Sequence, residues 1–363
     1  MSEHPTSGTA GPTTRPADSG TAAATAGTTA PPGPVPVPGG APLMTRLLSH
    51  PAGRDVGLVL ALGLVLVVGV VTAGERFASI DNALTILRLA SVVGVVAVGM
   101  TFVITGGGID LSVGAILALA SVWSTTVATQ LMAEDVHWTV IAFAAVAVGA
   151  GCGLVNGVLV AYGRLAPFIA TLAMFAAARG LAEIIAQRRT QIVTVDPFLD
   201  FFGGSVLGIP VLVILWALVV VAGWVLLNRT VFGRRTLAVG GNAEAARLAG
   251  IDVRRHTALL YVLVGVACGI GAIMIVARTT TGSSTHGQLL ELDAIAAVVI
   301  GGTLLSGGRG TIVGTVFGVL IFATLTNIFT LNNLDTSTQA VAKGAIIVAA
   351  VLLQQRVARR GPT

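Results

Sequence analysis

Residues 56–74 read VGLVLALGLVLVVGVVTAG, a run without a single charged side chain. An α-helix rises about 1.5 Å per residue, so a run of this length nearly crosses a hydrocarbon core of about 30 Å. Comparable runs recur along the chain, which predicts an all-α, polytopic membrane protein with about ten transmembrane helices. The predicted spans are 56–74, 85–105, 111–132, 137–161, 166–186, 207–227, 257–277, 293–306, 311–331 and 338–355.

The composition agrees with a membrane protein. Of the 363 residues, 54% are hydrophobic and only 10% are charged, whereas about a quarter of a soluble protein is charged. The net charge of +5 does not indicate nucleic-acid binding, because the basic residues stand at the ends of apolar runs. We therefore expect membrane lipid as a partner and no nucleic acid.

No chemistry-bearing set of residues stands out. The five histidines are scattered without metal-ligand spacing, and the sequence has no credible Ser–His–Asp set or pair of catalytic carboxylates. We expect no metal, no cofactor and no catalytic residue.

Residues 1–42 differ from the remainder of the chain. They are rich in Pro, Ala, Thr and Gly and end in PPGPVPVPGG, a composition that cannot bury enough apolar surface to fold. They also lack the basic start and apolar centre of a cleaved signal peptide. We predict a disordered cytoplasmic tail over 1–42 and a transmembrane domain over 43–357.

Arginine placement predicts the orientation of the chain. With the N-terminus in the cytoplasm, the opposite side holds only Arg76, Arg188, Arg189 and Arg278. The cytoplasmic side then holds Arg46, Arg54, Arg164, Arg229, Arg234, Arg235, Arg247, Arg254, Arg255, Arg309, Arg356, Arg359 and Arg360. Because cytoplasmic loops of membrane proteins are enriched in basic residues, we expect both termini to be cytoplasmic.

Glycines mark two breaks in the apolar pattern. The segment TGGGID separates the second and third spans, so these spans could form a broken or re-entrant pair. The pattern GGxxxxVG at 107–114 recurs at 307–314, 200 residues later. Transporters often contain internal repeats, and this echo is suggestive of one.

The loop 229–256 contains signals for one short helix. Asn242 is a good N-cap, residues 243–249 favour helix, and Gly250 suits a left-handed C-cap. Glu244 would lie in the first turn, where a negative charge suits the helix dipole. The helix is either an ordinary capped loop helix or a coupling helix that docks in a groove of a separate ATPase.

Four stretches carry a resemblance to a known family. GRRTLAVGGNAEAARLAGI (233–251) resembles the cytoplasmic coupling loop of the ribose/xylose/arabinose-type permeases of ATP-binding-cassette importers. TFVITGGGIDLSVGAILAL (101–119), NGVLVAYGRLAPFIATLAM (156–174) and AVVIGGTLLSGGRGTIVGTVFGVL (297–320) are similar to further hallmarks of that family. The resemblance covers about 44–355, in the family's order and spacing.

The resemblance implies a subunit that works in an assembly. It implies ATP-binding-cassette ATPase subunits on the cytoplasmic side, an extracytoplasmic solute-binding protein, and a second permease copy or close relative. The segments 75–82, 188–205 and 278–293 are candidates for contact with the binding protein. The residues that match the coupling loop are Gly233, Arg234, Gly241, Asn242, Glu244, Ala245, Ala246 and Gly250.

The sequence itself places ATP hydrolysis on another chain. It has no GxxxxGK[ST] phosphate loop, and its one lysine, Lys343, lies in the last apolar run. We expect Lys343 either to extend toward the interface or to pair with an acid such as Asp335. Arg88 and Arg179, near helix ends, are expected to extend toward the interface as well.

Polar side chains inside the apolar runs are candidates for a translocation path. A sugar hydroxyl that loses water without gaining a partner costs several kcal/mol, so a path needs hydrogen-bonding groups. The candidates are Thr105, Asp110, Ser112, Asn156, Thr303 and Asn327. Most such groups bond within their own helix or to a neighbouring one, and Asp110 suits an N-cap of the third span.

We therefore expect the membrane-spanning permease subunit of an importer for a ribose- or xylose-like monosaccharide, in the bacterial cytoplasmic membrane. A branched-chain amino acid, a nucleoside or inositol are alternative solutes. An ion-coupled secondary transporter is a further alternative, although such transporters usually carry acids or histidines at the bilayer midplane, where this chain has almost none.

Overall fold

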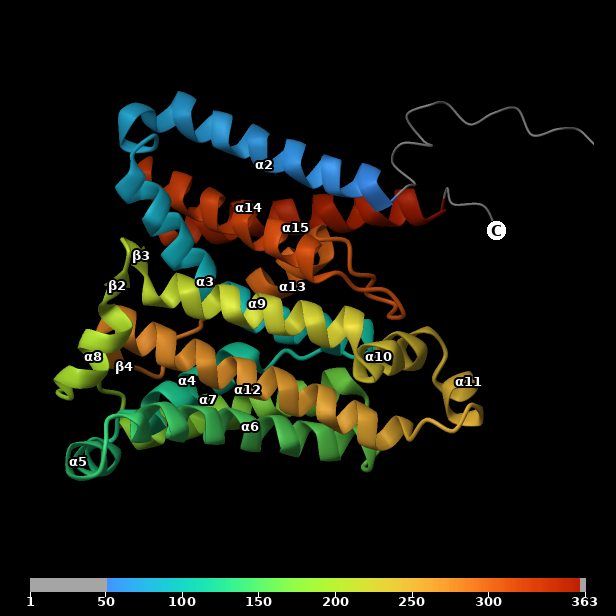
Figure 1. The fold of residues 1–363 in the computed structure, drawn as a ribbon, viewed down its shortest axis with the longest axis horizontal. Coiled ribbons are helices and arrows are strands. Elements are labelled where there is room, and N and C mark those ends of the chain that lie inside the picture. The colour runs from blue at the N-terminus through green and yellow to red at the C-terminus, as the bar shows by residue number, and fades with distance from the viewer. Residues whose placement is uncertain (1–50, 360–363) are drawn as a thin grey trace, which may run out of the picture. The chain divides into compact units, whose positions relative to one another are not determined.

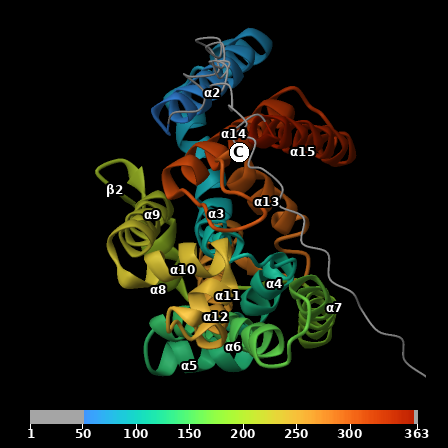
Figure 2. The same ribbon diagram turned by 90° about the vertical axis from the view of Figure 1, so that its right-hand side faces the viewer.

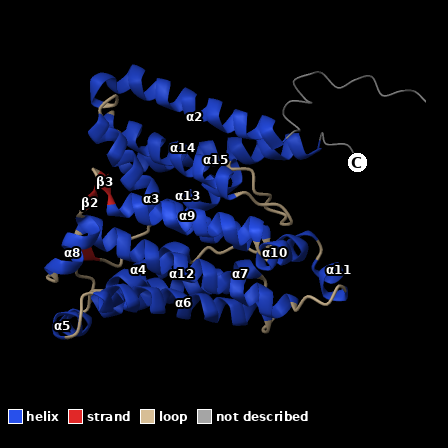
Figure 3. Ribbon diagram, in the orientation of Figure 1, coloured by secondary structure: helices blue, strands red, loops and turns tan. Residues whose placement is uncertain are grey.

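A computed structural model describes residues 51–359 of the chain, without the side chains of 51–55 and of part of 347–359. The tail predicted over 1–42 lies outside the described residues. Within 51–359 the structure is almost entirely helical, as predicted (Figures 1 and 3). The long helices are α2 (Pro51–Ala73), α3 (Ile80–Thr105), α6 (Thr139–Ala161), α7 (Pro167–Ala186), α9 (Val211–Arg229), α12 (Val253–Thr279), α14 (Ile312–Leu331) and α15 (Thr336–Arg359).

Short elements connect these helices. They are the 3₁₀ turn Gly74–Arg76 and the helices α4 (Val113–Ser124), α5 (Val127–Asp135), α8 (Asp196–Gly203), α10 (Val231–Gly241), α11 (Ala243–Leu248) and α13 (Leu290–Ile300). Two small antiparallel pairs join β1 (Gln191–Ile192) to β4 (Thr281–Gly282) and β2 (Ser205–Val206) to β3 (Ile209–Pro210).

The bundle has two distinct ends. Helices α5 and α8 and the strands gather at one end, and α10 and α11 lie at the other (Figure 1). We call these the α8 end and the α11 end. Arg229 ends α9 immediately before α10, whereas Arg188 follows α7 on the way to β1. Which end faces the cytoplasm stays a prediction.

The number of spans differs from the ten predicted. Among the described residues, seven helices are long and apolar enough to cross a membrane, or eight if the bent pair α4–α5 counts as one span. The prediction of a span over 293–306 is wrong, because α13 has only 11 residues and reaches about 16 Å, half the hydrocarbon thickness. The predicted span 338–355 falls in α15, part of which lies outside the described side chains.

Helices α3, α12 and α14 form the centre of the bundle, and α2 lies at its edge. Helix α12 packs closely on α6, because glycines face each other across the contact. A Cβ on Gly265 would lie 2.3 Å from the Gly149 carbonyl oxygen. In the same way, a Cβ on Gly149 would lie 2.3 Å from the Gly265 carbonyl oxygen. Such small-residue contacts are typical of membrane helices, whose association depends on close backbone approach.

Candidate functional site

The short helix expected in the loop 229–256 is present as α11. The Asn242 side chain caps it by accepting a hydrogen bond from the Ala245 amide at 2.9 Å, and Gly250 follows with φ +82°. Glu244 and Arg247 form an exposed ion pair one turn apart, and the hydrogen bond from Arg247 lowers the pKa of Glu244. Local capping signals therefore sufficed to locate this element.

The surface of α11 is almost wholly uncovered. Every residue from Asn242 to Gly250 is exposed except Ala246, which is 4% exposed and holds α11 against its own chain. Leu248 is 78% exposed. A six-residue helix is too short to be stable alone in water, so α11 with its apolar Leu248 fits a docking element.

Helix α10, which precedes α11, was not expected from the sequence. Thr230 caps it by accepting a hydrogen bond from the Gly233 amide at 3.3 Å. The segment was expected to be part of a loop, but it is helical, and Gly233 and Gly240 meet backbone where a side chain would not fit. Arg234 is exposed on its surface. The glycines of α10 therefore permit close backbone contact within a helix.

The C-terminal end of α10 lies in a junction of three glycine segments. A Cβ on Gly240 would stand 1.8 Å from the Thr105 carbonyl oxygen and 2.7 Å from the Gly308 amide nitrogen. The Gly308 amide donates a hydrogen bond to that same Thr105 carbonyl at 2.9 Å. Gly107 and Gly307 touch here as well, each with φ +84°. We call these residues (Thr105, Gly107, Gly240, Gly307 and Gly308) the glycine junction.

The glycine junction joins the two copies of the GGxxxxVG echo. One copy forms the break between α3 and α4, and the other forms the loop between α13 and α14. Both breaks therefore touch the helix that leads into α11. The Thr105 hydroxyl itself bonds to the Thr101 carbonyl of its own helix at 2.5 Å and is fully buried.

A second buried polar cluster lies just beyond the first break. Asp110 Oδ1 accepts hydrogen bonds from the Ser112 amide at 2.8 Å and from its hydroxyl at 2.5 Å. Asn156 Nδ2 on α6 donates to Ser112 Oγ at 2.9 Å. Asp110 is thus not the N-cap of α4, which is Ser112. All three residues are fully buried, so the cluster fixes the re-entry of the chain into α4.

The remaining path candidates lie elsewhere. Thr303 Oγ1 accepts a hydrogen bond from the Thr311 amide at 3.3 Å across the α13–α14 loop. Asn327 Nδ2 donates to Asn82 Oδ1 at 2.8 Å, at the start of α3 and about 34 Å along that helix from Thr105. The six candidates therefore form separate groups, and their role in a path stays a prediction.

The charged side chains of the apolar runs are paired differently from the expectation. Lys343 Nζ donates to Asp293 Oδ2 on α13 at 2.9 Å rather than pairing with Asp335. Arg179 does not extend freely toward an interface. Its guanidinium donates to the backbone carbonyls of Ser284 and His286, the latter at 2.9 Å.

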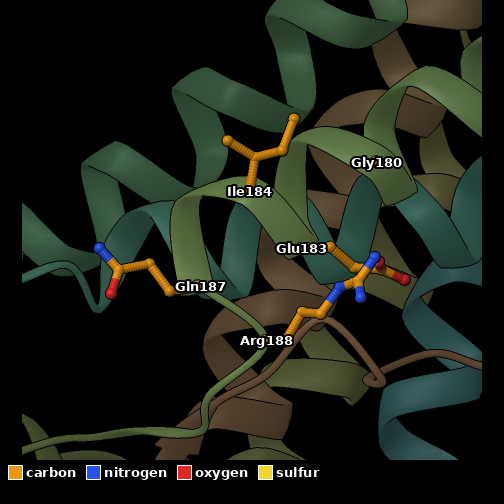
Figure 4. A pocket seen from close by; sticks show the side chains of 5 residues that line it. All are labelled: Gly180, Glu183, Ile184, Gln187 and Arg188. Atoms are coloured by element: carbon orange, nitrogen blue, oxygen red, sulfur yellow. The ribbon is translucent and has the colours of Figure 1, made fainter.

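Two neighbouring hollows follow the outward face of α7 toward the α8 end. One, of about 510 Å³, is lined by Gly180, Glu183, Ile184, Gln187 and Arg188 (Figure 4). The other, of about 470 Å³, is lined by Phe175, Arg179, Glu183, Ser284, Thr285, Gln288, Leu289 and Glu291. Figure 2 shows α7 at the edge of the bundle, with α4 beside it on the side toward the centre.

This polar face was not anticipated from the sequence. Arg179 and Glu183 are four residues apart, a spacing that places them on one face of a helix. This spacing was the one signal in the sequence for a polar face on α7. Their partners from residues 284–291 are about 105 residues away in the chain and could not be assigned from spacing.

Comparison with known proteins places the chain among transport permeases. The family model "Branched-chain amino acid transport system / permease component" matches residues 82–351. The ribose import permease protein of Bacillus subtilis (strain 168) is 44% identical over 298 residues, covering 81% of this chain and 91% of that protein. No solved structure gives a significant match.

Two further relatives carry other sugar names. The L-arabinose ABC transporter permease protein of Azospirillum brasilense is 39% identical over 277 residues, covering 76% of this chain and 80% of that protein. The D-allose transport system permease protein of Escherichia coli (strain K12) is 36% identical over 286 residues, covering 78% of this chain and 86% of that protein.

Proposed function

Because this chain belongs to the branched-chain amino acid transport system permease family, we propose that it is the membrane-spanning subunit of an ATP-binding-cassette importer for a monosaccharide. One observation carries the proposal: relatives named for ribose, arabinose and allose match about four fifths of the chain at 36–44% identity. The solute is then a small neutral sugar. Partner subunits supply ATP hydrolysis, and an extracytoplasmic binding protein delivers the solute.

The α11 end supplies the contact with the ATPase. Its exposed helix presents Leu248 beside the Glu244–Arg247 ion pair, an apolar anchor next to charges of both signs. An amphipathic helix of this kind fits a groove on a partner. This assignment makes the α11 end and both termini cytoplasmic, in agreement with the arginine distribution.

The glycine junction connects α11, through α10, to the membrane helices, so that a movement of α11 can be transmitted to them. Only Asn242 lies between α10 and α11. Gly240, in the last turn of α10, contacts Thr105 at the α3–α4 break and Gly308 in the α13–α14 loop. A shift of α10 therefore acts on the α3–α4 break and the α13–α14 loop together. Discontinuous helices at such breaks are a recurring feature of transporters.

Reconstitution tests the proposal directly. We expect proteoliposomes that hold this chain, its ATPase and the solute-binding protein to accumulate labelled D-ribose or a related sugar only with internal ATP. Orthovanadate should abolish uptake, whereas an ionophore that collapses proton and sodium gradients should leave it unchanged. Proteoliposomes with a hydrolysis-deficient ATPase are the matched control.

Two outcomes would contradict the proposal. Accumulation by the purified chain alone would show that no ATPase is needed. Uptake that persists with vanadate but stops with the ionophore would establish an ion-coupled transporter instead.

A further inference from the structure

The outward face of α7 changes character along its length. Phe168, Leu172, Phe175, Arg179 and Glu183 follow one another at helical spacing and share one stripe. Phe168 and Leu172, near the α11 end, are about half exposed and apolar. Arg179 and Glu183, nearer the α8 end, are charged. Arg179 lies about 10 Å inside the end of this candidate span, within the depth that hydrocarbon would occupy.

The Arg179 side chain is held in place by the loop after α12. Its guanidinium donates to the Ser284 and His286 carbonyls and lies 5.9 Å from the centre of the Phe175 ring. The loop is in turn held by α4, because His286 Nδ1 is 3.2 Å from Ser121 Oγ and Gly287 packs on Gly114. An arginine has five N–H groups, so several remain available to the adjoining hollow.

Glu291 provides an acceptor in the same hollow. It is 8% exposed, and its Oε2 has no hydrogen-bond partner among the described residues. The carboxylate fits here only because residue 114 is a glycine, since a Cβ there would lie 2.5 Å from that oxygen. A buried carboxylate oxygen without a partner is costly. The part of the Glu291 side chain that remains exposed lines the hollow, where its carboxylate can accept a hydrogen bond from a hydroxyl.

We propose that the hollow between α7 and residues 284–291 is half of a binding site for the translocated solute, a neutral polyhydroxylated molecule. Arg179 donates to the hydroxyl oxygens of the solute, Glu291 accepts from a hydroxyl, and Thr285 and Gln288 offer further partners at the rim. This inference rests on the proposed function, because it takes the α8 end as the side from which solute enters.

The open side of the half-site faces a second copy of this chain. Charged groups at this depth are not stable against lipid and face a protein partner or water. Each half carries both an arginine and acids, so a two-fold contact that sets the arginine of one copy opposite an acid of the other forms that pair twice. The apolar residues Phe168 and Leu172 on the same stripe then close the interface toward the α11 end.

A conservative substitution tests the half-site in the assembled importer. Glu291→Gln keeps the shape of the side chain and removes its charge, and Glu134→Gln on exposed α5 is the matched control. With labelled D-ribose as the probe, we expect Glu291→Gln to lower uptake by about tenfold, the loss of one charged hydrogen bond. ATP hydrolysis by the assembled importer without binding protein should stay within about twofold of wild type, because Glu291 lies on α13 and not on α10 or α11.

Water access provides a second measurement that does not depend on transport. In a Cys152→Ala/Cys268→Ala background, Gln288→Cys should react with a charged, membrane-impermeant thiol reagent, since a thiolate forms only in water. Ala147→Cys, exposed on α6 about 12 Å from the start of that helix, should react only with an apolar maleimide. Bound ribose at high concentration should slow labelling at position 288.

The outcomes separate this inference from the proposed function. Unchanged uptake by Glu291→Gln, or a parallel loss of uptake and ATP hydrolysis, would overturn the half-site. Labelling of Gln288→Cys only by the apolar reagent would also overturn it and place this face against lipid. If wild-type uptake needs no ATP, the proposed function fails while the labelling result still decides whether the hollow is a water-filled path.

Discussion

The substitution Gly240→Ala should separate the glycine junction from ordinary packing. The new Cβ would stand 1.8 Å from the Thr105 carbonyl oxygen and 2.7 Å from the Gly308 nitrogen, whereas ordinary contact begins at 3.4 Å. All of these obstructing atoms are backbone, so no side-chain rotation relieves the overlap. Helix α10 must shift, and the hydrogen bond from Gly308 to Thr105 lies directly in its way.

The expected cost follows from these contacts. Overpacking in a well-packed interior costs about 1–3 kcal/mol, and loss of the Gly308–Thr105 hydrogen bond adds about 1 kcal/mol. We expect the melting temperature of the detergent-purified chain to fall by several degrees. We also expect ribose uptake by the assembled importer to fall at least about tenfold, since a displaced α10 no longer moves both breaks together.

Gly151→Ala on α6 is the matched control. No described atom lies within 4 Å of the position its Cβ would occupy. An alanine at an exposed helical position stabilises by about 0.5–1 kcal/mol, so this variant should melt no lower than wild type and transport normally. If Gly240→Ala behaves like Gly151→Ala in both assays, the glycine junction does not transmit motion.

Leu248→Asp should abolish co-purification with the ATPase at unchanged melting temperature, whereas Leu207→Asp, which is 98% exposed between β2 and β3 at the α8 end, should leave the complex intact. Asn156→Ala removes the amide that bonds to Ser112 and should lower the stability of the purified chain by about 1–3 kcal/mol in a denaturation assay. Asp293→Asn and Lys343→Met each leave a half-buried charge unpaired, so each should destabilise more than the double variant does; additive effects in the cycle would contradict the pairing.

Elements governed by local signals could be predicted from the sequence. The long apolar runs located α2, α3, α6, α7, α9, α12 and α14 to within a few residues. Helix α11 was located because Asn242 and Gly250 act on backbone groups only a few residues away. Hydropathy and capping need no knowledge of the remainder of the fold.

Elements governed by distant contacts could not be predicted. The apolar run 293–306 looked like a span, but α13 stops at Ile300. Gly302 then adopts a left-handed φ of +87°, and Gly301 lies against Gly314, where a Cβ would be 2.4 Å from a backbone carbon. Hydropathy does not report where a chain leaves the helical conformation to make such a contact.

The candidate site shows the same division. Asp110, Ser112 and Asn156 were each noticed, but that they form one cluster depends on α6 packing beside the first break. The surroundings of Arg179 depend on a loop more than 100 residues later. Helical spacing placed Arg179 and Glu183 on one face, yet only the packing of α4 and α7 decides that this face is open.

The hydrogen bond between the Gly308 amide and the Thr105 carbonyl ties the tip of α3 at the α11 end to the segment that leads into α14. Two helices joined at one end can rotate about that point and separate at their other ends, but they cannot shift along their axes relative to each other. Conversion between states open to either side should therefore separate α3 and α14 near Asn82 and Asn327, where a side-chain hydrogen bond joins them, and leave the ends at Thr105 and Gly308 together. A disulfide engineered between positions 82 and 327 would hold these ends of α3 and α14 together and should stop transport.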